Sequence, residues 1–323
     1  MKKIVSLIIA AVIIMCSFSG CQSNEEKENK GEKKPVVVTT VFPFYDFARN
    51  IVKDKMDIKM LVEPGKSSHD YKSNIDLADL TLVHNSDMFI YCGGETDEFI
   101  KESDGFKDKD LSTVVCAMDE VQTFEEELVE GMQEEEHTFD EEHNEDAPET
   151  DEHIWTNPLN AIKICNKITE VAKKIDSANA TFYDKNCKEY CEKLTKLDES
   201  FENTVNNSKR KTIVVADRFP FRYLTERYSL KYFAAFPGCS SLGEASLATI
   251  SFLVNKVKTE KLPVVFYTDG STMSICNQVS KETGAKTLLL HSCHDLTKEE
   301  FESGEDYISL MNKNLTNLSE ALN

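Results

Sequence analysis

The sequence lacks the motifs that mark nucleotide-binding proteins and the common hydrolases. It contains no GxGxxG and no GxxxxGKS/T motif, which excludes the two common phosphate-binding loops. It also has no GxSxG nucleophile elbow and no HExxH zinc-protease motif. Basic residues form no patch and do not interleave with aromatic residues, so nothing favours a nucleic-acid partner. No repeat of 20–50 residues is visible, which excludes a solenoid.

Long hydrophobic runs are also scarce, and the main one lies at the start of the chain. It extends from Ile4 to Met15 and follows Lys2 and Lys3. These twelve residues are too few to span a bilayer as a helix, so the run is typical of an export signal.

A cysteine after small residues follows this run. Phe18-Ser19-Gly20-Cys21 resembles a bacterial lipobox, with Phe18 where Leu is usual. We expect residues 1–20 to be a signal peptide and Cys21 to carry a lipid that anchors the chain to the outer face of the cell membrane. An ordinary cleaved signal with an incidental cysteine is the alternative. Residues 21–35 are polar and charged and are expected to form a flexible tether.

The negative charge is concentrated in one segment. The formal net charge is -20, and residues 119–152 contain seventeen acidic and no basic residues. The rest of the chain is therefore nearly balanced. This segment also contains His137 and His143, two of only seven histidines in the chain. It is either a histidine-bearing loop that gathers metal or a solvated insertion with two incidental histidines.

Eight cysteines remain beyond Cys16 and Cys21, and none forms a CxxC pair. Disulfides are possible in an exported chain. Cys187 and Cys191 share one helical face and are equally well explained as small buried residues. Two other pairings remain open, Cys92 with Cys116 and Cys239 with Cys293.

Strand and helix patterns alternate in two parts of the chain, which predicts an α/β fold of two βαβ lobes with parallel sheets. After the tether, about 290 residues remain, and they are enough for two domains. In the first lobe, residues 36–177, we expect strands at Val36–Val41, Ile58–Val62, Met88–Tyr91 and Val114–Ala117 and helices at Phe44–Val52 and Ile75–Asn85. In the second lobe, residues 208–323, we expect strands at Ile213–Ala216, Tyr232–Ala235, Val264–Tyr267 and Lys286–Leu290 and helices at Tyr223–Tyr228, Leu247–Thr259, Met273–Thr283 and Tyr307–Leu322.

A long helix is expected between the two lobes, in residues 178–207. The stretch from Ala178 to Asn206 has no Gly or Pro and has apolar residues at helical spacing. At 1.5 Å per residue it would be about 43 Å long. It is long enough to connect both lobes rigidly.

Residues of the types that commonly bind metals follow several of the expected strands. Ligands of parallel sheets bind beyond the carboxyl ends of the strands. His69 lies in the loop after the second strand, and Asp217, Asp269 and the His291–Asp295 segment follow strands of the second lobe. Two facing lobes would present His69 and His153 from one side and Asp217, Asp269, His291 or His294 from the other. Imidazole and carboxylate are common ligands of divalent transition metals.

Four landmarks in the same order resemble a known family. They are Val38-Thr39-Thr40-Val41-Phe42-Pro43, His69-Asp70-Tyr71, His153-Ile154-Trp155-Thr156-Asn157-Pro158 and Gly304-Glu305-Asp306-Tyr307-Ile308-Ser309-Leu310-Met311. From Val36 onward the chain is similar to the cluster A-I zinc and manganese receptors of bacterial ABC importers. The resemblance implies two lobes joined by a long helix, and a metal bound between them.

The resemblance assigns His69 and His153 as metal ligands. The family's third ligand falls on Arg218, whose permanently charged guanidinium cannot bind a cation. The fourth falls near His294 and Asp295. Our hypothesis is that His294 supplies the third nitrogen, with Asp217 and Asp295 as carboxylate ligands. His291 and Asp269 remain the alternatives.

The sequence therefore predicts a lipid-anchored, extracytoplasmic, monomeric binding protein and not an enzyme. It would deliver Zn²⁺, or else Mn²⁺, to an ABC permease in the membrane. Two or three imidazoles with a carboxylate suit zinc, whereas manganese prefers more oxygen ligands. A zinc-dependent hydrolase is the alternative from another class, and a surface adhesin is a further role described within the same family.

Overall fold

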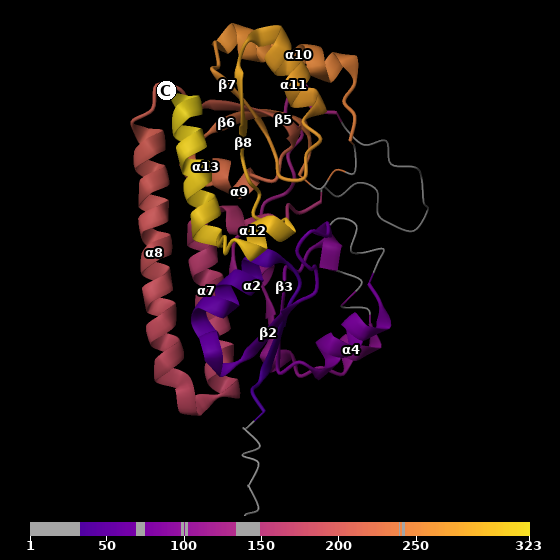
Figure 1. Cartoon of the computed structure of the whole chain (residues 1–323), viewed down its shortest axis with the longest axis vertical. Helices are drawn as coiled ribbons and strands as arrows, with labels where there is room; N and C mark the ends of the chain where they lie inside the picture. Colours follow the sequence, from indigo (N-terminus) through magenta and orange to yellow (C-terminus); the bar gives the residue numbers. More distant parts are fainter. Residues whose placement is uncertain are drawn as a thin grey trace, which may run out of the picture. The chain divides into compact units, whose positions relative to one another are not determined.

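The computed structural model describes residues 33–68, 75–97, 100, 103–133, 149–238, 240 and 243–323 (Figure 1). Four predicted positions, Cys21, His69, His137 and His143, lie outside these ranges. Pro35–Asn323 forms one compact unit. Within the described ranges, no helix combines the length and the apolar character needed to cross a bilayer.

The first lobe contains a four-stranded parallel sheet in the order β2-β1-β3-β4. Its strands are β1 (Val36–Thr39), β2 (Asp57–Met60), β3 (Met88–Tyr91) and β4 (Val114–Cys116). Its helices and 3₁₀ turns are α2 (Phe42–Val52), η2 (Lys53–Lys55), α4 (Leu77–Asn85), η3 (Glu95–Asp97), α6 (Asp104–Lys107), η4 (Leu111–Thr113), η5 (Met118–Glu120), η6 (Ile154–Thr156) and α7 (Pro158–Ile175). Every residue of β3 is buried, which explains its unbroken apolar sequence.

The second lobe repeats this strand order as β6-β5-β7-β8. Its strands are β5 (Thr212–Arg218), β6 (Lys231–Phe236), β7 (Val264–Tyr267) and β8 (Lys286–Leu289). Its helices are α9 (Arg222–Tyr228), α10 (Leu247–Glu260), α11 (Ser274–Thr283), α12 (Lys298–Glu302) and α13 (Tyr307–Leu322). The two lobes of parallel sheet confirm the predicted fold class.

Side chains of β5 alternate between two hydrophobic cores. Ile213 and Val215 belong to the core that runs through both lobes, whereas Val214 and Ala216 belong to a separate core. That second core contains Leu253 of α10 and other residues of α10 and α11. Because successive strand residues point to opposite faces, helices cover both sides of the sheet.

The long connecting helix is α8 (Ala180–Asn206), which follows the 3₁₀ turn η7 (Ser177–Asn179). It contacts α2 and α7 of the first lobe and α9 and α13 of the second (Figure 1). One face of α8 is buried along its length, from Tyr183 to Val205. The helix predicted over Ala178–Asn206 is therefore present and starts two residues later.

A buried carboxylate fastens α8 to both lobes. Asp46 of α2 accepts hydrogen bonds from Tyr190 Oη of α8 at 2.8 Å and from the backbone N–H of Tyr307, at the start of α13, at 3.3 Å. Arg49 pairs with the same carboxylate at 2.6 Å. Burial raises the pKa of Asp46 in spite of these partners.

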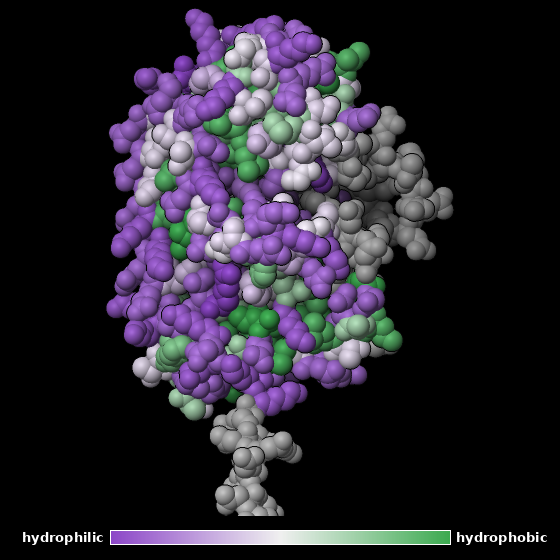
Figure 2. All heavy atoms as spheres, in the orientation of Figure 1, coloured by the Kyte–Doolittle hydropathy of each residue, from purple (hydrophilic) through white to green (hydrophobic). Residues whose placement is uncertain are grey.

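The face of the molecule shown in Figure 2 is mostly hydrophilic where it is coloured, with hydrophobic side chains in small patches. Cys92 is a free thiol, and the disulfide considered between Cys92 and Cys116 is therefore not formed. Cys293 is also a free thiol, and its considered partner Cys239 lies outside the described residues.

Candidate metal-binding site

His153 lies on a short buried segment between the acidic region and η6. Its side chain is 1% exposed, and its Nδ1 is 3.2 Å from Oδ1 of Asp151. The same Oδ1 accepts the backbone N–H of His153 at 2.8 Å, which holds the carboxylate in place. A donor role for Nδ1 leaves Nε2 as the nitrogen that can bind a metal, which is the arrangement typical of metal-ligating histidines.

Burial lowers the pKa of His153, but the carboxylates of Asp151, Glu152 and Glu126 together outweigh it and raise the pKa above its ordinary value. The net charge around the ring is therefore negative. Such a ring position favours a bound cation.

His294 comes from the loop after β8 and faces His153 across the junction of the two lobes. The two ring centroids are 5.3 Å apart, and the ring planes are at 89°. Two imidazoles that bind one zinc at about 2.0–2.1 Å with a tetrahedral angle have centroids about 5 Å apart. The observed separation therefore fits two ligands of one cation.

Trp155 packs against both histidines, with ring centroids 5.5 Å from His153 and 4.9 Å from His294. Its indole N–H donates to the backbone oxygen of Ser292 at 2.8 Å. The hydroxyl of Tyr307 donates to the backbone oxygen of Trp155 at 2.6 Å. This residue of the first lobe is thus held by two elements of the second and lies at the seam between the lobes.

Asp295 is tied to the loop that precedes His69. Its Oδ2 accepts the backbone N–H of Ser68 at 2.9 Å and the Ser68 hydroxyl at 3.0 Å. Among the described residues its other oxygen, Oδ1, is buried and accepts no hydrogen bond. Burial raises the pKa of Asp295 to about 6, although the two Ser68 hydrogen bonds oppose this shift.

His291 and Asp269 are used within the second lobe instead. The backbone N–H of Cys293 donates to His291 Nδ1 at 2.9 Å, which leaves the ring proton on Nε2, 3.4 Å from Oε1 of Glu300. Asp269 accepts the Ser292 hydroxyl at 2.7 Å. Cys293 has a φ of 61°, and this reversal of the backbone separates the surroundings of His291 from those of His294.

Asp217 lies at the end of β5, where its Oδ1 accepts the backbone N–H of Arg218 at 2.9 Å. Arg218 in turn donates to the backbone oxygen of Ser240 at 3.4 Å. Within the described part of the chain, Asp217 makes no hydrogen bond or ion pair with His153 or His294. Among the described residues, the structure thus places the rings of His153 and His294 side by side, whereas Asp295 contacts Ser68 and Asp217 contacts Arg218.

The described residues do not form a complete site by themselves. Among them, which exclude His69, no group of three or more His, Cys, Asp and Glu side chains is arranged to hold a metal ion. His69 follows Ser68 directly in the chain, and this finding covers neither it nor His137 and His143.

The sequence did not identify Asp151, Ser68 or Ser292 as parts of the site. Asp151 has a local signal, since a carboxylate two residues before a histidine can accept its Nδ1–H. Ser68 and Ser292 have none, because their partners are distant in the chain.

The acidic segment begins and ends beside Asp151. The backbone N–H of Asp151 donates to the oxygen of Phe124 at 2.9 Å, and that of Glu126 donates to the oxygen of Glu149 at 2.7 Å. Gln133, where the described part of the segment ends, donates its backbone N–H to Ala235 of β6 at 2.9 Å. The two histidines of this segment lie outside the described residues.

Comparisons with solved structures identify the same architecture elsewhere. The Zn(II)-bound ZnuA-like domain of AdcA from Streptococcus pneumoniae has a TM-score of 0.72 and 26% identity, over 90% of this chain and 99% of that one. The metal-dependent lipoprotein YcdH from Bacillus subtilis has a TM-score of 0.73 and 28% identity, over 90% and 100% of the two chains. The laminin-binding protein Lbp of Streptococcus pyogenes is 20% identical at a TM-score of 0.67 and shares the fold alone.

Sequence comparisons agree. The high-affinity zinc uptake system protein ZnuA of Bacillus subtilis is 29% identical over 316 residues, which cover 98% of this chain and 96% of that protein. The zinc-binding lipoprotein AdcA of Streptococcus pneumoniae is 29% identical over 323 residues, which span only 61% of its length. The family profile described as zinc-uptake complex component A, periplasmic, matches residues 37–321. These matches confirm the resemblance drawn from the four landmarks, and the chain belongs to this family of zinc-uptake components, which are binding proteins and not enzymes.

Proposed function

We propose that this chain captures Zn²⁺ between its two lobes, with His69, His153 and His294 as nitrogen ligands and Asp295 as the carboxylate. The observation that carries the proposal is the 5.3 Å separation of the His153 and His294 rings, which come from different lobes. Asp151 Oδ1 lies 3.2 Å from Nδ1 of His153 and holds the orientation of its ring. Asp295 has a buried oxygen that accepts no hydrogen bond among the described residues.

His69 enters the proposal through its neighbour in the chain. Ser68 is bonded to Asp295 at 2.9 Å and 3.0 Å, and adjacent Cα atoms are about 3.8 Å apart. A long imidazole directly after Ser68 is therefore a natural third nitrogen ligand. The family resemblance assigns the same role to this residue.

The ligand set favours zinc over manganese. Three imidazoles and one carboxylate form the tetrahedral nitrogen and oxygen site that zinc prefers, whereas manganese prefers more oxygen ligands. Similar proteins are named for zinc uptake and zinc binding. We assign manganese as the second choice.

The cargo is handed to an ABC permease in the membrane. In this proposal residues 1–20 are a signal peptide, Cys21 carries the lipid anchor on the outer face of the cell membrane, residues 21–35 are the tether, and the protein acts as a monomer. The relatives include a protein named as a zinc-binding lipoprotein. The lobes are assigned as residues 36–177 and 208–323, with 178–207 as the connecting helix.

Two histidines of one loop provide a matched test. We expect His294→Ala to weaken zinc binding by orders of magnitude, because it removes a ligand. His291→Gln keeps a polar side chain next to Glu300 and should leave the zinc affinity within about threefold, since it has no ligand role. The measurement is competition for zinc with a chromophoric chelator, on residues 22–323. Equal losses for the two variants, or no loss for His294→Ala, would exclude the proposed ligand set.

The acidic segment is proposed to gather zinc for this site through His137 and His143. Replacing both by Ala should slow zinc loading at scarce zinc and leave the equilibrium affinity unchanged, because the ligands of the main site remain. Stopped-flow mixing with a zinc-buffered solution measures the rate. An unchanged rate would identify the segment as a solvated insertion.

A further inference from the structure

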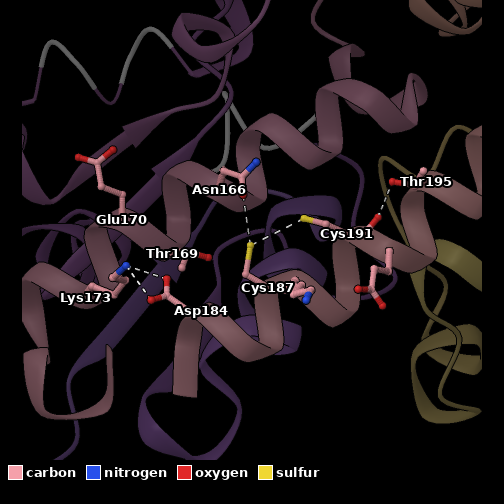
Figure 3. Close-up of a pocket in the computed structure, with 10 residues that line it drawn as sticks. Asn166, Thr169, Glu170, Lys173, Asp184, Cys187, Cys191 and Thr195 are labelled. Atoms are coloured by element: carbon pink, nitrogen blue, oxygen red, sulfur yellow. Dashed lines mark hydrogen bonds and ion pairs between the residues drawn. The ribbon is translucent and has the colours of Figure 1, made fainter. Parts of the chain in front are cut away.

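Two cysteines of α8 form a close pair away from the junction of the lobes. Cys187 and Cys191 are one helical turn apart, and their Sγ atoms are 3.7 Å from each other (Figure 3). Cys187 is 4% exposed, and Cys191 is partly exposed. Nothing in the proposed zinc site uses either of them.

A disulfide does not fit this pair. Side chains at positions i and i+4 of a helix have Cβ atoms about 5–6 Å apart, whereas a disulfide needs about 3.5–4.5 Å. Closing the bond would require α8 to unwind where it packs on α7. The pair is therefore built to remain two thiols.

The pair lies on a cavity of about 510 Å³ between α7 and α8. Lysine and carboxylate side chains from both helices line it, including Lys173 and Asp184, which form an ion pair at 2.7 Å (Figure 3). Cys187 Sγ also lies 3.5 Å from Oδ1 of Asn166. A small ion thus has a route to the sulfurs along the cavity.

The two sulfurs have a separation that one cation can bridge. With a metal–sulfur bond of about 2.3 Å, two sulfurs on one ion are about 3.8 Å apart at a tetrahedral angle and about 4.6 Å apart when the three atoms are in line. The observed 3.7 Å is just below this range, so a small rotation of the partly exposed Cys191 side chain suffices.

The remaining ligands decide which ion fits. Within the described ranges no three His, Cys, Asp or Glu side chains are arranged around one ion, so a four-coordinate zinc site is not supported here. Soft thiolate ligands select ions such as Cu(I), which accepts as few as two sulfurs. The thiols must lose their protons on binding, because hydrogen bonding with Cys165 and burial raise the pKa of Cys191 to about 12.

We propose that Cys187 and Cys191 form a second, thiol-based site for a soft monovalent d¹⁰ cation of the Cu(I) type. Two S–H bonds break, two metal–sulfur bonds form, and two protons go to solvent, without any change of oxidation state. The site is separate from the zinc site and does not depend on the proposed function.

The test is an anaerobic titration of reduced residues 22–323 with Cu(I) held by a coloured bidentate chelator, in excess Zn²⁺ to fill the histidine site. We expect the protein to withdraw one equivalent of Cu(I). Cys191→Ser, at the partly exposed position, should weaken this binding at least about 100-fold, since it removes one of two ligands, and Cys187→Ser should do the same. Cys276→Ser, a buried thiol of α11, is the matched control and should change it less than about threefold.

X-ray absorption at the copper edge identifies the atoms bound to copper, which a loss of folding would not reproduce. Two sulfur neighbours support the proposal, and a shell of nitrogen neighbours overturns it. The proposal is also overturned if the protein withdraws no Cu(I), if Cys191→Ser binds as the native chain does, if Cys276→Ser loses as much affinity, or if mass mapping recovers Cys187 and Cys191 as a disulfide.

Discussion

Asp151 offers the sharpest test of the zinc site, because it contacts a proposed ligand and does not bind the metal itself in our proposal. Its carboxylate accepts from both His153 Nδ1 and the His153 backbone N–H. Asp151→Asn keeps the shape and an oxygen for the backbone N–H but removes the negative charge. When a cation binds Nε2, the Nδ1–H becomes a stronger donor, so the lost charge matters most in the zinc-bound state.

The expected size of the effect follows from the kind of hydrogen bond. A bond to a charged partner contributes about 1.5–3 kcal/mol and a neutral one about 0.5–1.5 kcal/mol. The difference, about 1–2 kcal/mol, corresponds to an increase of about 5- to 30-fold in the Kd for zinc. This agrees with the about 10- to 100-fold losses typical when the partner of a metal-bound histidine is removed.

The assay is zinc competition with a chelator, together with urea unfolding of the metal-free protein. Asp110→Asn is the control, since Asp110 is an exposed carboxylate of the first lobe that caps η4. We expect its zinc Kd to stay within about twofold of the native value. A native-like Kd for Asp151→Asn would refute the argument. So would a loss of unfolding free energy as large as the loss of binding energy, because the effect would then be structural.

Three further changes test how the lobes are held. Trp155→Phe leaves the backbone oxygen of Ser292 without its donor, so we expect about 1–3 kcal/mol less stability in urea unfolding and weaker zinc binding; a native-like pair of values would contradict this. Arg227→Met breaks the 2.7 Å pair with buried Asp198 and should cost about 2–4 kcal/mol in the same assay, more than the exposed Lys286→Met. Glu300→Gln should destabilise the metal-free protein at neutral pH by about 2 kcal/mol or more.

The pH dependence of the Glu300→Gln effect has a definite sign. Hydrogen bonding with His291 lowers the pKa of Glu300 to about 2, from an ordinary 4.5. Its ionised form therefore stabilises the folded state fully above about pH 4.5, and this contribution disappears as the pH falls towards 2. The difference in unfolding free energy between the native chain and Glu300→Gln should shrink over this range. A difference that is constant with pH would mean that the charge of Glu300 is not the cause.

The fold could be predicted because its information is local. Strands such as β3 are apolar at every position, as a strand buried on both faces must be, and the alternation of such runs with amphipathic helices indicates parallel sheets. The ends of some elements differ from the prediction. The strand expected over Val36–Val41 ends at Thr39, because Pro43 starts α2 within its first turn and draws Phe42 into the helix.

The helix α7 was not predicted, although its signals are present. Asn157 caps it by accepting the backbone N–H of Leu159 at 2.9 Å, and Pro158 occupies its first position. Buried Ile164, Ile168 and Val171 recur at helical spacing.

The candidate site, like the fold, has a part that the sequence predicts and a part that it does not. His153 and His294 could be proposed from their motif and their place after a strand. The hydrogen bonds around them could not, because Ser68 and Asp295 are 227 positions apart and Trp155 and Ser292 are 137 apart. Such pairs depend on loop conformations. One example is the positive φ of Cys293, which separates His291 from His294. The three-residue spacing of these two histidines does not encode that conformation.

These cross-lobe bonds bear on how zinc enters and leaves. Separating the lobes would break the Trp155–Ser292 and Ser68–Asp295 hydrogen bonds, whose groups are buried or partly buried. It would also strain the hydrogen bonds of Asp46, which join α2 and α8 to the start of α13. Each buried group left without its partner costs about 1–3 kcal/mol. Zinc exchange by a wide opening of the lobes would thus cost much of the stability of an ordinary domain, about 5–15 kcal/mol. Local movement of the loops that carry the ligands is the less costly route, so we expect ligand exchange without a large change in the separation of the lobes.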